Sequence, residues 1–318
     1  MNGTEAAYRE IEERFAAWAR IQPDIRAAFV VGSRARVDDH PADEWADLDI
    51  MIVTSHPHRY LSRGDWTKNF GRVWLTFVEP TPAGGAMERR AIYEGCLDVD
   101  FAVIPSSRVR PMAYLLTALE RFPFLQRLVP RGVRRELGLG SELLRRGMRV
   151  IIDRDGLAEK IPLALSLAPP PAPPSRGEFR RALDDFWHHA PWTAKHLRRG
   201  ELWWAKSSCD GRLKQLLLQM MEWHARATRG WDLDTWQRGR FLEQWADPRA
   251  VEALPHVFAR YNQEDVWRAL FASMDLFRWL AMETAQRLSY PYPALADERV
   301  TEWVKRLAET RPHGKNRA

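Results

Sequence analysis

AAFVVGSRARVDDHPADEWADLDIMIV, residues 27–53, gives the first indication of the fold. It holds an apolar run at 27–31 that ends in a Gly-Ser pair, and a second apolar run that opens with Asp47-Leu48-Asp49. Short apolar and β-branched runs bounded by Gly and Asp are typical of strands, so we predict two strands here. One residue separates the two acids, so on a strand both carboxylates point to the same face, about 6.5–7 Å apart along the chain.

The Gly-Ser pair and the two acids suit the binding of a phosphate and a metal ion. Two carboxylates on one face can hold hard cations that also bind phosphate oxygens. Gly32 allows a sharp turn and a close approach of the backbone to a phosphate. Ser33 adds a hydroxyl and an N–H at a predicted helix start, where anions are favoured.

A third acid is needed to complete a two-metal site or to serve as a base, and a later strand supplies it. The run Leu97–Ile104 predicts a strand with Asp98 and Asp100 on one face. Asp100 lies deeper in the apolar run, where an acid is costly unless it pairs or binds a metal. Each acid alone is compatible with an ordinary turn or capping role, but the whole set predicts a metal site.

The rest of the first half predicts a sheet that carries helices. Ile11, Phe15 and Trp18 recur at helical spacing and predict a first amphipathic helix. Further strands are expected at 73–78 and 149–152, and further helices at 111–129 and 134–146. This pattern is typical of an α/β or α+β domain, which we place at residues 1–165.

A proline-rich segment separates this half from a helical one. Six prolines fall within 162–174, so we predict a linker over 162–176, followed by a helical domain at 177–318. Eleven of the fifteen tryptophans lie at or beyond Trp187, where they pack between helices or form an aromatic wall facing a ligand. The fold class is therefore α+β, a mixed sheet flanked by helices and then an all-α bundle. The expected helices are 177–198, 201–228, 248–260, 263–288 and 295–309.

Composition narrows the functional class. The net charge is +6, but residues 1–165 carry 24 Lys and Arg against 23 Asp and Glu, so the basic excess lies in the second half. Eight arginines against two acids at 121–149 form either a solvated surface or a polyanion footprint, and we expect no nucleic-acid partner. No run approaches the roughly 18 apolar residues of a membrane span. Two cysteines without metal-ligand spacing, and an N-terminus charged from Glu5 onward, favour a cytoplasmic protein. The sequence leaves the oligomeric state open, and we favour a monomer.

The arrangement Gly-Ser, Asp-x-Asp and later Asp resembles that of the polymerase-β-like nucleotidyltransferase superfamily. Later blocks resemble the aminoglycoside 6-adenylyltransferases, which are streptomycin adenylyltransferases. The resemblance implies a mixed-sheet nucleotidyltransferase domain followed by a helical substrate-binding domain. The resembling blocks are residues 30–53, 92–105, 148–156, 184–225 and 266–293.

The resemblance also implies roles for individual residues. Asp47, Asp49 and Asp100 are the implied catalytic and metal-binding carboxylates, holding two Mg²⁺ ions, and Asp100 is either a ligand only or also the base. The residues implied to bind the ATP phosphates are Gly32, Ser33, Arg34, Lys195 and Lys206. The acids implied to grip a polycationic acceptor are Glu79, Glu88, Glu201 and Glu222.

The implied reaction transfers AMP from ATP to a hydroxyl of an aminoglycoside, with the 6-hydroxyl of streptomycin favoured, and releases pyrophosphate. One alternative is a nucleotidyltransferase with another acceptor, such as a lincosamide or a protein hydroxyl. Another is a catalytically idle nucleotide-binding or RNA-binding module. Three intact acids argue against an idle module, because mere binding needs no buried carboxylates beside phosphates.

Overall fold

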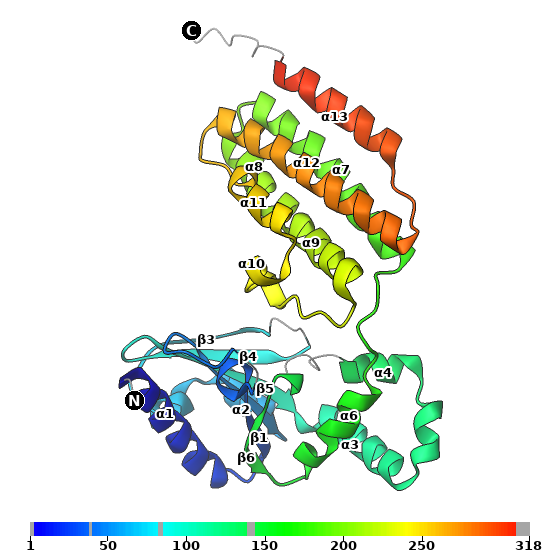
Figure 1. Cartoon of the computed structure of the whole chain (residues 1–318). Coiled ribbons are helices and arrows are strands. Elements are labelled where there is room, and N and C mark those ends of the chain that lie inside the picture. The colour runs from blue at the N-terminus through cyan, green and yellow to red at the C-terminus, as the bar shows by residue number, and fades with distance from the viewer. Residues whose placement is uncertain (1–2, 38–39, 82–84, 139–143, 310–318) are drawn as a thin grey trace. The chain divides into compact units, whose positions relative to one another are not determined.

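The chain folds into two compact units, Met1–Pro169 and Pro170–Ala318. The computed structural model describes residues 3–37, 40–81, 85–138 and 144–309. The first unit combines a sheet with helices, and the described residues of the second form helices and their connections (Figure 1). The predicted α+β class is confirmed.

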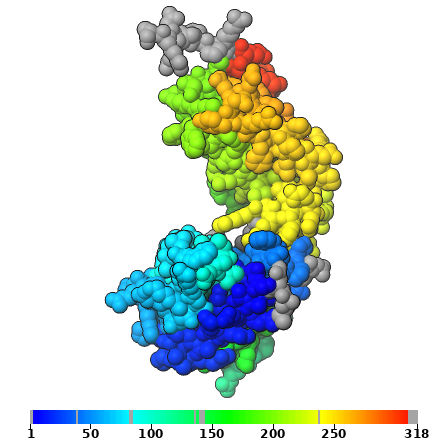
Figure 2. Space-filling model, turned by 90° about the vertical axis from the view of Figure 1, so that its left-hand side faces the viewer, coloured from blue at the N-terminus to red at the C-terminus, as the bar shows by residue number. Residues whose placement is uncertain are grey.

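The first unit is built on a mixed six-stranded sheet in the order β3-β4-β5-β2-β1-β6. β2 and β5 pair in parallel, while the other neighbouring strands pair antiparallel. In the space-filling view of Figure 2, the visible face of this unit shows mainly the blue and cyan colours of the N-terminal part of the chain. The strands are β1 (Ile25–Val31), β2 (Leu48–Thr54), β3 (Val73–Pro80), β4 (Met87–Tyr93), β5 (Leu97–Pro105) and β6 (Arg149–Asp153).

At β1 both faces of this sheet are covered, and the alternating side chains of the strand enter two different cores. On β1, Ala28 and Val30 join the core that contains Phe15 of helix α1, whereas Ala27 and Phe29 join a core on the other face. The near-continuous apolar run of β1 therefore reflects burial on both sides. The helices of this unit are α1 (Gly3–Arg20), α2 (Pro57–Ser62), α3 (Ser106–Arg121), α4 (Arg131–Gly138) and α6 (Leu157–Leu167).

Two helices of the first unit differ from the prediction. The helix expected at 111–129 starts earlier and stops at Arg121, because Pro123 opens a separate turn of 3-10 helix at Pro123–Leu128. The helix expected at 134–146 is observed as Arg131–Gly138, and its residues 139–143 lie outside the described part.

Strand β4 was not predicted. Its sequence, MERRAIY, places three charged residues in succession, which hides the alternation that marks a strand. Glu88 and Arg89 are nevertheless buried, because each finds a partner within the sheet or beneath it.

The proline-rich segment is only partly a linker. Helix α6 continues to Leu167 with Pro162 inside it, so the prediction of a linker from residue 162 is wrong at its start. Packing accounts for this, since Leu163 and Leu167 join a small core with Leu116 of α3 and offset the hydrogen bond lost at the proline. The non-helical stretch ends at Ser175, which caps α7 in a capping box with Glu178.

The second unit is a helical bundle. Its helices are α7 (Arg176–Arg198), α8 (Leu202–Ser207), α9 (Leu213–Arg229), α10 (Leu242–Trp245), α11 (Pro248–Val257), α12 (Gln263–Leu288) and α13 (Ala294–Glu309). The helix predicted at 201–228 is divided, because a π-helical turn at Ser208–Arg212 joins α8 to α9. Phe186 stacks on Phe277 at the centre of the bundle, with ring centroids 3.7 Å apart.

The tryptophans of the second unit have different environments. Trp187 and Trp245 are buried in the bundle core, whereas Trp203 and Trp204 are exposed. Core packing therefore accounts for part of the tryptophan enrichment. In the described part of the chain, no helix combines the length and apolar character needed to cross a bilayer.

Candidate metal centre and nucleotide site

Three carboxylates converge at one edge of the sheet. Asp49 on β2 lies directly opposite Asp100 on the parallel strand β5, and Asp47 immediately precedes β2. One carboxylate oxygen from each of the three residues lies within 4.8 Å of the others. The structure thus brings together the acids that the sequence spacing singled out.

The residues present fit a divalent cation. Asp100 is buried, and its Oδ1 has no hydrogen-bond partner among the described residues. Burial raises the pKa of Asp100 to about 8; Arg90 opposes this shift, and the charges of Asp98 and Asp49 add to it. An anion crowded in this way is stabilised by a metal ion, and a set of three carboxylates suits Mg²⁺.

Two features require glycine at position 32: its backbone conformation and its close contact with Asp49. Its φ of +69° lies in the left-handed region, and a Cβ placed there would lie 2.0 Å from Oδ2 of Asp49. Any other residue at this position would displace the carboxylate of Asp49. The predicted helix start after Gly32 is a short turn of 3-10 helix, Gly32–Ala35, which includes Ser33.

Arg34 supports the strand that carries the acids. Its guanidinium donates hydrogen bonds of 2.8 and 3.1 Å to the carbonyl of Ala46 and pairs with Glu5 at 3.0 Å. It also lies 3.8 Å from the ring centroid of Tyr8. Ala46 directly precedes Asp47, so these bonds hold the first acid in place. Contact of Arg34 with a nucleotide remains a prediction.

Arg90 is a neighbour of the carboxylate cluster that the sequence pattern did not predict. It lies on β4 opposite Asp100 and pairs with Oδ2 of that residue at 3.1 Å. The same guanidinium contacts Glu88 at 3.1 Å and Glu79 at 2.6 Å. These acids raise the pKa of Arg90, although burial acts to lower it. The sequence feature that could have revealed Arg90 is its spacing from Glu88, since residues two apart lie on the same face of a strand, but the strand β4 was not predicted.

Glu79 and Glu88, predicted to bind an acceptor, are a matched pair in this sheet. They lie opposite each other on β3 and β4, and Arg90 pairs with both. Glu88 is buried, whereas Glu79 is half-buried. Their charges are therefore partly neutralised within the chain.

Asp98 shares the face of β5 on which Asp100 lies. Burial raises the pKa of Asp98; Arg90 opposes this shift, and Asp47 adds to it. Its backbone N–H donates to the hydroxyl of Tyr8 at 3.1 Å. This acid adds negative charge beside the three-carboxylate cluster.

The two predicted phosphate-binding lysines belong to the second unit. The Lys195 ammonium lies 5.5 Å from the ring centroid of Trp303, and its side chain is exposed. Lys206 pairs with Asp210 and donates a 2.6 Å hydrogen bond to the carbonyl of Ala259. Their roles toward a triphosphate remain predictions.

The second unit also contains the other two acids that were predicted to bind the acceptor, Glu201 and Glu222. Glu201 pairs with His196 and, at 2.8 Å, with Arg199. Glu222 is half-buried on α9. A role for either in acceptor binding stays a prediction.

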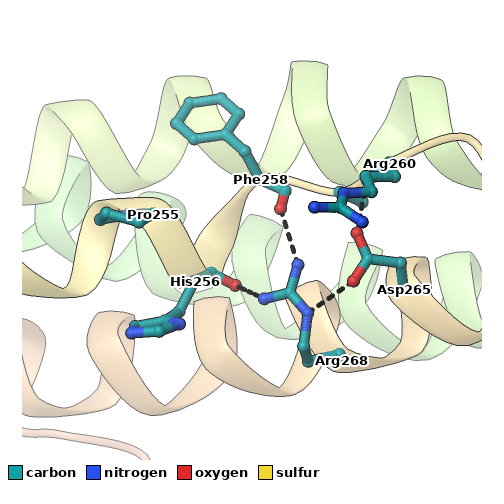
Figure 3. A pocket seen from close by; sticks show the side chains of 7 residues that line it. Pro255, His256, Phe258, Arg260, Asp265 and Arg268 are labelled. Carbon is teal, nitrogen blue, oxygen red and sulfur yellow. Dashed lines mark hydrogen bonds and ion pairs between the residues drawn. The ribbon is translucent and has the colours of Figure 1, made fainter.

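A pocket of about 570 Å³ lies in the second unit between α11 and α12 (Figure 3). Arg268 dominates it, donating to the carbonyls of His256 and Phe258 at 2.5 and 2.9 Å and to Asp265 at 2.7 Å. These polar groups satisfy one another, and no residue predicted for the functional site lines the pocket. Its lining residues are Pro255, His256, Phe258, Ala259, Arg260, Asp265 and Arg268.

Comparison with known proteins agrees with this geometry. The family model described as streptomycin adenylyltransferase matches residues 6–307. The chain belongs to the streptomycin adenylyltransferase family. It is accordingly a nucleotidyltransferase enzyme, and the predicted family resemblance is confirmed.

Individual relatives are distant. An aminoglycoside 6-adenylyltransferase of Bacillus subtilis (strain 168) is 21% identical over 308 residues, covering 93% of this chain and 96% of the relative. Another from Staphylococcus aureus is 22% identical over 120 residues, which are 38% of this chain and 43% of the relative. The crystal structure of an aminoglycoside 6-adenyltransferase from Bacillus subtilis covers 95% of this chain and 97% of its own, with 18% identity and a TM-score of 0.43.

Proposed function

We propose that this enzyme transfers AMP from ATP to a hydroxyl of an aminoglycoside, with the 6-hydroxyl of streptomycin favoured, and releases pyrophosphate. One observation carries the proposal: Asp47, Asp49 and Asp100 converge within 4.8 Å in a chain of this family. We place the reaction in the cytoplasm, where the free cysteines Cys96 and Cys209 would stay reduced.

The three carboxylates would hold Mg²⁺, for which we propose two ions. When bound, the metal supplies charge neutralisation at the phosphates and at the attacking and leaving oxygens. Gly32 and Ser33 would place backbone N–H groups against the phosphates at the turn that follows β1. Arg34 would contribute by holding the backbone just before Asp47.

Asp100 is suited to accept the proton of the attacking hydroxyl. Its Oδ1 has no hydrogen-bond partner among the described residues, and a bound Mg²⁺ ion would keep the carboxylate ionised and therefore able to take a proton. In the proposed reaction the acceptor oxygen bonds to the α-phosphorus, the bond to pyrophosphate breaks, and the hydroxyl proton passes to this carboxylate.

For the acceptor, we propose binding through carboxylates, because aminoglycosides carry several positive charges at neutral pH. Glu79 is the more exposed member of the pair on β3 and β4, and Glu201 and Glu222 are the proposed contributors from the second unit. A lincosamide or protein acceptor would use the same metal centre but would not need these acids.

The test measures pyrophosphate release from ATP and Mg²⁺ with streptomycin, spectinomycin, kanamycin, lincomycin or no acceptor. We expect release to depend on an aminoglycoside and to be fastest with streptomycin. Release that is equal without acceptor, or that only lincomycin stimulates, would contradict the proposed substrate class. A parallel series with GTP determines the nucleotide preference.

A further inference from the structure

A single guanidinium joins the surface of the sheet to the metal-binding carboxylates. Arg90 contacts Glu79, Glu88 and Asp100, which lie on three neighbouring strands, β3, β4 and β5. The exposed fraction of the side chains falls along this path, from 41% at Glu79 and 28% at Arg90 to 6% at both Glu88 and Asp100. We call Glu79, Glu88, Arg90 and Asp100 the acidic path; these contacting side chains run from a partly exposed acid to the third carboxylate of the cluster.

Without Arg90 this path would hold three carboxyl groups and would lack the cation that they share. Glu79, Glu88 and Asp100 would lie next to one another without the cation that now contacts all three. Carboxylates in such surroundings attract cations more strongly than in water, because screening is weaker at buried sites. In the described part of the chain, Arg90 is the cation that pairs with Asp100.

The cationic groups of an aminoglycoside have the same chemistry as the side chain of Arg90. An ammonium or guanidinium group forms charge-assisted hydrogen bonds with carboxylates. Such a group entering the path would bind Glu88 and Asp100 and would compete with the metal ion for the third carboxylate. A cationic group of the acceptor would then occupy the position beside Asp100 that the reacting hydroxyl needs.

We propose that Arg90 determines acceptor specificity by excluding the acceptor's cationic groups from Glu88 and Asp100, so that an uncharged hydroxyl reaches Asp100. This inference rests on the proposed function and adds to it the residue that sets which face of the acceptor enters. Arginine suits the task better than lysine, because its planar fork contacts several carboxylates at once.

The test measures Mn²⁺ binding, from the loss of the paramagnetic resonance signal of free Mn²⁺, with and without streptomycin. In the wild-type protein, streptomycin should change the apparent dissociation constant for Mn²⁺ by less than about twofold. In Arg90→Gln, streptomycin should raise it by about tenfold or more, equivalent to about 1.4 kcal/mol. Arg90→Lys, which keeps the charge, should lie between the two.

Arg72→Gln is the matched control, because Arg72 pairs with Glu94 on the exposed surface of the same unit. It should behave like the wild type. An equal shift in the wild type and Arg90→Gln, or no shift in Arg90→Gln, would overturn the proposal.

Two further measurements keep the test decisive. Arg90→Gln removes the ion pair that Arg90 forms with the buried Glu88, which can prevent folding. In that case Glu88→Gln/Arg90→Gln is compared with Glu88→Gln, and competition between streptomycin and Mn²⁺ is expected only in the double variant.

A second series of measurements uses spermidine, a polycation that is not an aminoglycoside, in place of streptomycin. If the wild type modifies no acceptor, the proposed function fails, while competition by spermidine in Arg90→Gln alone still supports exclusion by Arg90.

Discussion

At the scale of the residue, Asp100 occupies surroundings that favour its neutral form. Burial raises its pKa from 3.8 to about 8; Arg90 opposes the shift, and Asp98 and Asp49 contribute to it. Between these pH values the folded protein binds a proton that the unfolded chain has released. The metal-free fold therefore loses stability as the pH rises from 3.8 towards 8.

We predict that Asp100→Asn stabilises the metal-free protein while abolishing transfer. An uncharged side chain avoids the cost of the buried carboxylate, and the gain should be about 1–2 kcal/mol, or about 2–8 °C in the melting temperature. Thermal unfolding in EDTA measures this, and the gain over wild type should be larger at pH 8 than at pH 5. Asp65→Asn, at an exposed acid, is the control; a lower melting temperature for Asp100→Asn would contradict the prediction.

The three acids could be predicted because their spacing alone places them on strand faces. Arg90 could not, because its importance depends on the antiparallel register that puts it opposite Asp100. The same register pairs Glu79 with Glu88 around this arginine. Sequence spacing indicates which residues share a face, but it does not indicate which strands are neighbours.

Among the elements, the strand β2, which carries Asp49, is stabilised at its end by hydrogen bonding to the buried acid Asp24. Asp24, just before β1, accepts hydrogen bonds from Tyr60 of α2 at 2.5 Å and from Thr54 at the end of β2 at 3.0 Å. It also pairs with Arg59 at 3.0 Å. Burial acts to raise the pKa of Asp24, but the hydrogen bonds from Tyr60 and Thr54 outweigh it, so the pKa is lowered.

A lowered pKa means that Asp24 stabilises the fold above its ordinary value of 3.8, and that this contribution is lost as the pH falls through the folded value. We predict that Asp24→Asn lowers the free energy of unfolding at pH 7 by about 1–3 kcal/mol. Urea unfolding at pH 7 and pH 3 should show the difference from wild type shrinking at pH 3. Tyr60→Phe, which removes one hydrogen bond, should have a smaller effect, and an equal loss for Asp24→Asn at both pH values would count against this role.

The strands β1, β2 and β5 could be predicted because burial on both faces makes them long apolar runs. Strand β4 could not, since its charged residues are satisfied only by neighbours distant in sequence. In the second unit, Asn262 caps α12 by accepting the N–H of Asp265 at 2.8 Å. The π-helical turn at Ser208–Arg212 has no comparable sequence signal, because helical residues continue through it.

At the scale of the whole molecule, each unit has a core of its own. The buried residues of the large helical core lie at or beyond Phe179, and those of the other cores lie at or before Leu167. The composition break at the prolines agrees with this division. The identity of the acceptor cannot be derived from such patterns, because it depends on the positions of individual charges on the surface.

Nucleotidyl transfer by the three-carboxylate centre can be tested with ATP that is labelled at the α- or the γ-phosphorus. The measurement follows each label in the presence of streptomycin and saturating Mg²⁺. We predict that the α label enters the antibiotic and the γ label leaves in pyrophosphate. Asp49→Asn should reduce transfer by at least about 10²–10³-fold while leaving the fold intact. Transfer of the γ label to the antibiotic, or turnover by Asp49→Asn close to that of the wild type, would contradict the account.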